Sequence, residues 1–329
     1  MNELSPIERL FNTFDETAAT LQQELSCTYL DALAETAENL FQQKILQDEM
    51  SDLAKKRVWK KYEETKLAGY SKEEIRQAYQ LAILKGMQEN VQPNHQMTPD
   101  SIGLFISYLL EKFMRGKKEF AILDPAIGTG NLLLTMLNRQ PEASVSAIGV
   151  DVDDLLLKLA WCGANLMEQP VQLYNQDGLE PLFIDPADAV VCDLPVGWYP
   201  NDVRAADYEL KAEEGHSFAH HLFMEQSVKH TKPGGYLFFL IPNGLFEEAG
   251  ADKLHRFFQK HVHIQGIIQL PLTMFKNKQA AKSILILQKQ QEGVLAPKRV
   301  FLANMPSMKD RQAMQSIMVK MDDWFKESK

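Results

Sequence analysis

A seven-residue loop, Asp124-Pro125-Ala126-Ile127-Gly128-Thr129-Gly130, constrains the fold more than any other segment of the chain. It follows a short apolar run and precedes 131–137, which has the composition of a helix. The two glycines allow the backbone to turn tightly and to approach a ligand without an obstructing Cβ. The sequence predicts a strand, a glycine turn and a helix with a ligand held at the turn, although a plain strand-to-helix turn also fits the glycines alone.

The spacing of the glycines argues against a dinucleotide-binding loop. Such a loop carries a third small residue three positions after its second glycine. That position is Leu133 here, and a leucine side chain would crowd the helix against the strand. Binding of NAD is therefore disfavoured.

Short apolar runs alternate with helical segments from about residue 120 onward, which is typical of buried parallel strands joined by crossover helices. The predicted strands are 120–123, 145–150, 171–174, 189–192, 235–241, 263–270 and 283–288. We therefore predict an α/β fold that binds its ligand at the carboxyl ends of the strands. The tail after Pro297 is too short for a further domain.

Residues 1 to about 90 have a helical pattern instead. Their apolar stripe consists of Phe14, Ala18, Leu21, Leu25, Leu33, Ala37 and Leu40. Ser71 and Glu74 have the spacing of a capping box at a helix start. We predict a helical N-terminal domain over 1–92 and a second domain over 93–329. The helical stripe is expected to be core, with partner binding or homo-oligomer formation as the alternative.

An aspartate stands at the end of each of four successive predicted strands, at positions 124, 151, 177 and 193. A carboxylate at Asp151 can accept hydrogen bonds from both hydroxyls of a ribose, as in nucleotide-binding folds. Asp177 can accept a hydrogen bond from an adenine amino group. The series therefore predicts a ligand that resembles a nucleotide.

As a set, these motifs resemble the class I S-adenosylmethionine (SAM)-dependent methyltransferases, whose sheet is Rossmann-like. Within them the chain is similar to the N6-adenine DNA methyltransferases, especially the modification subunits of type I restriction systems. The resemblance covers about residues 95–290, and Met97-Thr98-Pro99 is similar to the motif that closes over the cofactor. It implies SAM as cofactor. The implied cofactor-binding residues are Thr98, Asp124, Pro125, Ala126, Gly128, Gly130, Asp151, Val152, Asp177, Gly178 and Asp193.

The catalytic motif of that family, N/D-P-P followed by an aromatic residue, comes directly after the fourth strand. Its acid or amide accepts hydrogen bonds from the target amine, and its ring stacks on a base flipped out of the helix. Here the segment is Asp193-Leu194-Pro195-Val196-Gly197-Trp198-Tyr199-Pro200, so one proline and the aromatic residue are replaced. Trp198 or Tyr199, two or three residues after Val196, supplies the stacking ring instead. The alternative is that both rings only pack the loop. The implied catalytic residues are Asp193, Pro195 and Tyr199.

The resemblance implies N-methylation of an amino group, with adenine in DNA or RNA as the acceptor. However, only about 40 residues follow the last predicted strand, so a target recognition domain is missing. Residues 185–224 also carry eight acidic side chains against one arginine and one lysine, which would repel a phosphate backbone. Nucleic acid as a partner therefore calls for a partner subunit that supplies specificity. The alternatives are a protein or small-molecule acceptor, or a SAM-binding regulatory or scaffold protein without catalysis.

Other features of the sequence set limits on the cofactor and the location. The cysteines at 27, 162 and 192 form no C-x-x-C pair, and His216, His220 and His221 match no complete metal site, so we expect no metal. The N-terminus lacks the pattern of a signal peptide, and the most apolar stretch, 236–241, is too short to cross a bilayer. We expect a cytoplasmic protein without a membrane partner.

Overall fold

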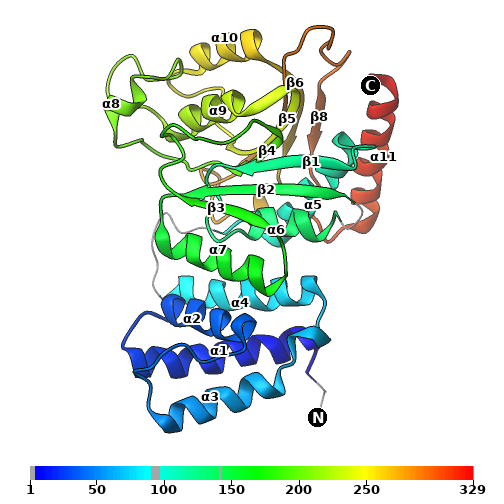
Figure 1. Ribbon diagram of the computed structural model, residues 1–329. Helices are drawn as coiled ribbons and strands as arrows, with labels where there is room; N and C mark the ends of the chain where they lie inside the picture. Colours follow the sequence, from blue (N-terminus) through cyan, green and yellow to red (C-terminus); the bar gives the residue numbers. More distant parts are fainter. Residues whose placement is uncertain (1–3, 90–96, 141–142, 329) are drawn as a thin grey trace. The chain divides into compact units, whose positions relative to one another are not determined.

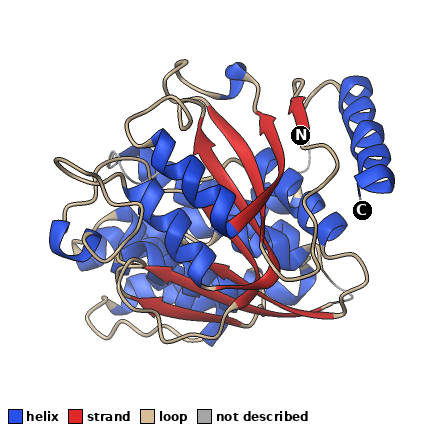
Figure 2. Cartoon of the chain, turned by 90° about the horizontal axis from the view of Figure 1, so that it is seen from above, coloured by secondary structure: helices blue, strands red, loops and turns tan. Residues whose placement is uncertain are grey.

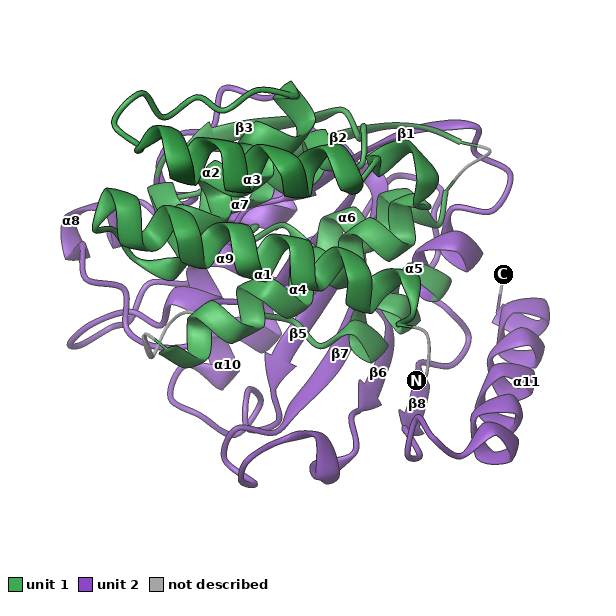
Figure 3. Ribbon diagram, turned by 90° about the horizontal axis from the view of Figure 1, so that it is seen from below, with its two compact units in different colours: residues 1–108, 127–176 green, residues 109–126, 177–329 purple. Residues whose placement is uncertain are grey.

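The computed structural model describes residues 4–89, 97–140 and 143–328. The chain divides into two units, drawn in different colours in Figure 3: unit 1 comprises Met1–Tyr108 and Ile127–Gln176, and unit 2 comprises Leu109–Ala126 and Asp177–Lys329. The chain contains both helices and strands (Figure 2), and strands are interspersed with helices from residue 119 onward, which confirms the predicted α/β class. The predicted domain boundary between residues 92 and 93 lies outside the described residues.

The first part of unit 1 is helical, as the sequence predicts (Figure 1). Its helices are α1 (Pro6–Leu25), α2 (Tyr29–Gln42), α3 (Asp52–Glu64) and α4 (Lys72–Glu89). The predicted capping box starts α4: the Ser71 N–H donates to the Glu74 carboxylate at 2.8 Å, and the Glu74 N–H donates to the Ser71 Oγ at 3.2 Å. Helix α1 packs against α2 and α4, with the rings of Phe14 and Tyr79 5.3 Å apart.

The rest of unit 1 is an α/β segment. Its elements are α5 (Asp100–Phe113), which ends in unit 2, α6 (Asn131–Asn138), β2 (Ser144–Asp151), α7 (Asp154–Leu166) and β3 (Val171–Asn175). Strands β2 and β3 are parallel, and their last residues, Asp151 and Asn175, lie side by side. Helix α4 packs against both α6 and α7. The N-terminal helices and the helix that follows the glycine loop therefore belong to one unit.

Unit 2 contains the other strands of the described chain: β1 (Glu119–Asp124), β4 (Ala187–Asp193), β5 (Thr231–Pro242), β6 (Val262–Gln269), β7 (Lys282–Lys289) and β8 (Phe301–Asn304). Their order is β1-β4-β5-β7-β6-β8, and β7 runs antiparallel to both of its neighbours, β5 and β6. Strand β1 is parallel to β4, and β4 to β5, so Asp124 and Asp193 both stand at carboxyl ends of parallel strands. Each of the seven predicted strands is confirmed, with ends shifted by a few residues.

The helices of unit 2 are α8 (Asp202–Ala205), α9 (Ala219–Lys229), α10 (Ala251–His261) and α11 (Arg311–Ser328). A short 3₁₀ turn occurs at Leu272–Met274 in unit 2 and another at Leu67–Gly69 in unit 1. The tail after Pro297 is not a domain, but it forms β8 and α11, which the sequence did not predict. Trp324 and Phe325 of α11 pack edge-on or tilted against the ring of Phe113. None of the helices described is both long and apolar enough to cross a membrane.

Candidate functional site

The glycine loop begins in unit 2, at the end of β1. Asp124 is buried, and its carboxylate accepts a hydrogen bond from the Ala126 N–H at 3.2 Å, which closes a tight turn around Pro125. A Cβ on Gly178 would lie 2.3 Å from the Pro125 carbonyl oxygen. Gly178 is therefore required by the close approach of two backbone segments, a role in packing that the sequence did not reveal.

The loop continues into unit 1, where its glycines have the left-handed backbone that favours this residue: φ is +55° at Gly128 and +79° at Gly130. The Gly128 N–H donates to Asp151 Oδ2 at 2.7 Å, so the loop is tied to the end of β2. A Cβ on Gly128 would meet no atom within 4 Å, whereas one on Gly130 would lie 3.1 Å from the Cβ of Ala160. The loop thus faces open space at Gly128 and α7 at Gly130.

Asp151 is held by the backbone on two sides, since its other oxygen accepts from the Asp153 N–H at 2.9 Å. Burial raises the pKa of the Asp151 carboxyl above its ordinary value, and the bonds from Asp153 and Gly128 partly oppose that rise. Val152, the next residue, is 71% exposed. The end of β2 therefore presents a fixed carboxylate beside an exposed apolar side chain.

Asp177, the first residue after the end of unit 1, accepts two hydrogen bonds within unit 2. They come from the Leu179 N–H at 2.9 Å and from the Tyr199 hydroxyl at 2.6 Å. Tyr199 is only 5% exposed, and burial together with the bond to Asp177 raises the pKa of its phenol. Its ring is packed and its hydroxyl is engaged, so its predicted catalytic role stays a prediction.

Trp198 differs from its neighbour Tyr199. It is 61% exposed and stacks on Phe218 with ring centroids 4.2 Å apart and an interplanar angle of 16°. The backbones of Trp198 and Phe218 also form an isolated bridge. Of the two rings that the sequence offered as a replacement for the family's aromatic residue, Trp198 is the one that presents a face to solvent.

Asp193 ends β4 and forms an ion pair with Lys282, the first residue of β7. Leu194 is buried, whereas Val196 is 54% exposed at the place of the family's stacking ring. Pro195 lies between them. Sequence reasoning missed Lys282, although a lysine stands directly before the last predicted strand.

His220 and His221, near the start of α9, both donate to Glu248 Oε1, at 2.7 and 3.0 Å. Both imidazoles are buried. Burial raises the pKa of the Glu248 carboxyl, but the two histidine bonds outweigh it and lower the value to about 2. The three ligand atoms lie within 4.8 Å of one another, a geometry found in no other group of described residues. Both bonds to Glu248 use the Nε2 atoms, and the Nδ1 of His220 is buried without a hydrogen-bond partner in the described part of the chain. His216 lies on Asp202 instead. The expectation of no metal stays a prediction.

Comparison with known proteins identifies the family. The model of the N-6 DNA methylase family matches residues 71–329. The chain belongs to the N-6 DNA methylase family. A second model, that of the YtxK N-terminal helical domain, matches residues 8–87, so α4 lies within both matches. An uncharacterized protein of Bacillus subtilis (strain 168), YtxK, is 53% identical over 321 residues, which cover 97% of this methylase-family chain and 98% of YtxK.

Solved structures agree with this assignment. A Listeria monocytogenes protein assigned to the class I SAM-dependent methyltransferases is 50% identical, with a TM-score of 0.92 over 97% of this chain and 99% of its own. The methyltransferase subunit of a type I restriction-modification system from Streptococcus thermophilus is 17% identical, with a TM-score of 0.66 over 97% of this chain and 74% of its own, and shows the shared fold. The expected family resemblance, the methyltransferase fold and the N-terminal helical domain are therefore confirmed.

Proposed function

We propose that this methylase-family chain binds SAM at its glycine loop and transfers the methyl group to an amino nitrogen, with adenine in DNA or RNA as the first acceptor to test. The observation that carries the proposal is the bond from the Gly128 N–H to Asp151 Oδ2. It joins the glycine loop to a carboxylate at the end of β2, where nucleotide ligands of such folds bind.

The residues of unit 1 fit the cofactor. Each oxygen of Asp151 accepts one backbone N–H and keeps a second lone pair, which suits the two hydroxyls of the ribose. The exposed Val152 can cover one face of the adenine, and the open space at Gly128 leaves room for the ligand. The family resemblance adds Thr98 as the residue that closes over the cofactor.

The family resemblance also assigns residues to the two ends of the cofactor. By the resemblance, Asp124, Pro125 and Ala126 bind the methionine end, and Asp177 accepts from the adenine amino group. The hydroxyl of Tyr199 fixes the Asp177 carboxylate through their 2.6 Å bond. Tyr199 thus fits a supporting role for adenine binding better than base stacking.

Bound SAM supplies an electrophilic methyl group, and the protein has only to bind and orient the acceptor. Asp193 would accept a hydrogen bond from the acceptor amine, because an ionised carboxylate is purely an acceptor. Lys282 holds that carboxylate in place through their ion pair. Pro195 would stiffen the turn that follows, and the exposed face of Trp198 is the surface on which a planar acceptor would stack.

A regulatory SAM-binding protein is the second candidate. Two observations favour it: the ion pair occupies the carboxylate that would receive the amine, and Val196 replaces the stacking ring. The acidic segment 185–224 favours a protein or small-molecule acceptor, or a partner subunit that brings nucleic acid. The N-terminal helices are the surface we would test first for self-association, and we expect a cytoplasmic location.

Calorimetry and a methyl-transfer assay test the proposal. We expect micromolar binding of SAM and S-adenosylhomocysteine (SAH), where 10 μM corresponds to about −7 kcal/mol. Tritiated SAM is then incubated with DNA, RNA and cell lysate, and label is counted by polymer type. Label in nucleic acid supports adenine as the acceptor. Label in protein or in small molecules would instead assign the acceptor to that class. Tight SAM binding without transfer favours the regulatory candidate, while binding of NAD instead of SAM contradicts the proposal.

A further inference from the structure

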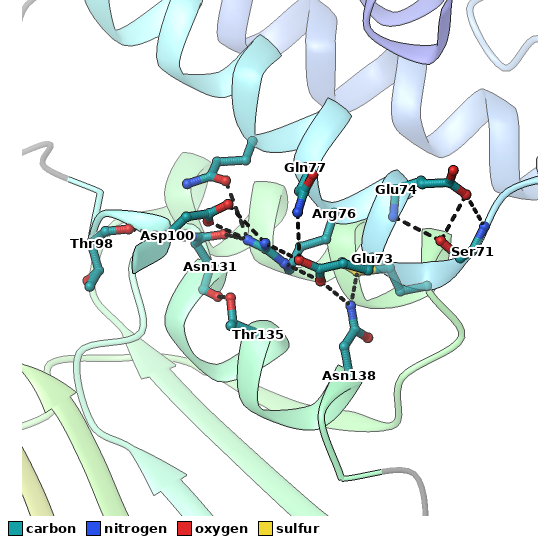
Figure 4. Close-up of polar contacts among 12 residues, drawn as sticks. Ser71, Glu73, Glu74, Arg76, Gln77, Thr98, Asp100, Asn131, Thr135 and Asn138 are labelled. Carbon is teal, nitrogen blue, oxygen red and sulfur yellow. Dashed lines mark hydrogen bonds and ion pairs between the residues drawn. The ribbon is translucent and has the colours of Figure 1, made fainter. Parts of the chain in front are cut away.

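Arg76 of α4, labelled in Figure 4, is a buried cation in unit 1, and its relative exposure is 2%. Its guanidinium forms two paired contacts with carboxylates. Nε and Nη2 donate to Glu73 at 2.8 and 2.6 Å, and Nη1 and Nη2 donate to Asp100 at 2.7 and 3.0 Å. A buried charge is tolerated only when it is paired and hydrogen-bonded in this way. Arg76 thus joins α4 to the first residue of α5.

A further bond connects Arg76 to the glycine loop. Its Nη1 donates to Asn131 Oδ1 at 2.7 Å, and Asn131 directly follows Gly130 as the first residue of α6. The Asn131 side chain uses its other end to donate to the Thr98 carbonyl oxygen at 3.0 Å. Figure 4 shows the resulting chain of contacts from Arg76 through Asn131 to Thr98. It connects three segments that are distant in sequence.

Helix α6 begins without a side-chain cap. Its N-cap is Gly130, which has no side chain to accept from the first N–H groups. A lone cation is disfavoured at a helix N-terminus. Here, however, Glu73 and Asp100 accompany Arg76, so the three side chains together carry one negative charge. The guanidinium can therefore hold Asn131 without placing a net positive charge at the start of the helix.

We propose that Arg76 is a positioning residue of the cofactor site: through Asn131 it holds the Thr98-Pro99 segment and the end of the glycine loop in the arrangement that binds SAM. The proposal rests on the proposed function, because it takes these segments as the cofactor site. It makes the N-terminal helices a component of that site. The overlap of the two family matches at residues 71–87, which contain Arg76, agrees with such a shared role.

Three variants test the proposal by SAH calorimetry at a temperature where circular dichroism shows each one folded. Arg76→Met removes the guanidinium group but keeps a side chain of similar length, and we expect the affinity for SAH to fall about tenfold or more. Asn131→Ala breaks the connection to Thr98 but leaves both ion pairs of Arg76 in place, so it reports on positioning even if Arg76→Met proves unstable. The control is Arg57→Met on the exposed surface of α3, for which affinity should stay within about twofold of wild type.

The double variant Arg76→Met/Asn131→Ala distinguishes positioning from general destabilisation. If Arg76 acts through Asn131, the double variant loses no more affinity than the weaker-binding single variant, because coupled residues are non-additive. If Arg76 affects SAH binding, then SAH binding must also affect the helix that carries Arg76. SAH should therefore slow amide exchange in α4 of wild type and of Arg57→Met, but not of Arg76→Met. A purely structural residue would not remove this ligand-dependent protection.

These experiments distinguish failure of the proposed function from failure of the positioning role alone. If wild type binds neither SAM nor SAH, the proposed function fails and the positioning role falls with it. If wild type binds SAH and folded Arg76→Met and Asn131→Ala bind it equally well, the positioning role alone is refuted. The positioning role is also refuted if the affinity losses of the two single variants multiply in the double variant. It is refuted as well if SAH still protects α4 from amide exchange in Arg76→Met. Arg76→Lys should restore folding but not full affinity, because an ammonium lacks the planar guanidinium that contacts Glu73, Asp100 and Asn131 at the same time.

Discussion

Lys282 at the start of β7 holds Asp193 at the end of β4 in an ion pair in which both side chains are about one-fifth exposed. Strand β5 lies between the two strands, with Leu240 opposite Asp193 and Pro242 opposite Lys282. The carboxylate that would receive the acceptor amine is therefore held from β7, the second strand along the sheet from β4.

Asp193→Ala should lower methyl transfer at least ~100-fold, because orientation of reacting groups accounts for several kcal/mol of a barrier. SAH affinity should stay within a few fold. Lys282→Met should reduce kcat less, since it leaves the carboxylate in place but no longer held. Single-turnover rates with labelled SAM measure both effects, and Lys278→Met, at an exposed lysine nearby, is the control. Full activity in Asp193→Ala would exclude Asp193 from the reaction.

Asp151→Ala should weaken SAH binding by about 1–3 kcal/mol, the usual cost of losing hydrogen bonds to a charged group. The pH dependence follows from the raised pKa of this carboxyl. Ribose hydroxyls donate to its ionised form, so affinity should fall on acidification, beginning at a higher pH than for an ordinary aspartate. Calorimetry across pH checks this, with Asp154→Ala, an exposed neighbour, as the control. Unchanged affinity in Asp151→Ala would place the ribose elsewhere.

Tyr199→Phe and Trp198→Ala should affect different steps. Tyr199→Phe removes the donor to Asp177, so it should weaken SAH binding by about 1 kcal/mol, as for one lost hydrogen bond. Trp198→Ala removes an exposed ring, so it should raise KM for a planar acceptor and leave SAH affinity unchanged. Binding and steady-state assays separate the two. The opposite result, with Tyr199→Phe raising acceptor KM alone, would restore Tyr199 as the stacking residue.

The isolated chain should bind duplex DNA weakly. Its formal net charge is −9, and segment 185–224 is strongly acidic. Fluorescence anisotropy at physiological salt should give a dissociation constant no tighter than the non-specific range of about 10⁻⁴ to 10⁻⁶ M. Nanomolar, sequence-dependent binding would contradict this prediction and remove the need for a partner subunit.

Asp188 at the start of β4 should make stability sensitive to acid. Its carboxylate accepts hydrogen bonds from Lys117, from Lys232 and from the Ala121 N–H. Burial raises the pKa of this carboxyl, but the hydrogen bonds outweigh burial and lower the pKa to about 2. Because the folded pKa lies below the unfolded value, the contribution is full above about pH 4 and is lost as pH falls toward about 2. Both lysines are half exposed, so Asp188→Asn should cost only about 1 kcal/mol at neutral pH. Denaturant unfolding at pH 7 and pH 3 checks this, and an equal loss at both pH values would assign the effect to packing.

Much of the fold was accessible from local sequence. The apolar runs of β1 to β7 and the capping box at Ser71 are short-range patterns, so each could be recognised without knowing its neighbours. Strand β8 and α11 were missed because Phe301 packs on Trp324, and Trp324 packs on Phe113, which is far away in sequence. An edge strand of four residues carries too little periodicity of its own to be predicted.

The same distinction applies to the candidate site. The sequence by itself determined the glycine loop and the four aspartates that end or follow strands, because strand alternation and turn chemistry are local properties. Only the tertiary structure decided the partners of these residues. Lys282 is 89 positions from Asp193 and Arg76 is 55 from Asn131, yet each pair is in direct contact. Such contacts are made by strand register and helix packing, which bring together side chains whose spacing along the chain carries no signal.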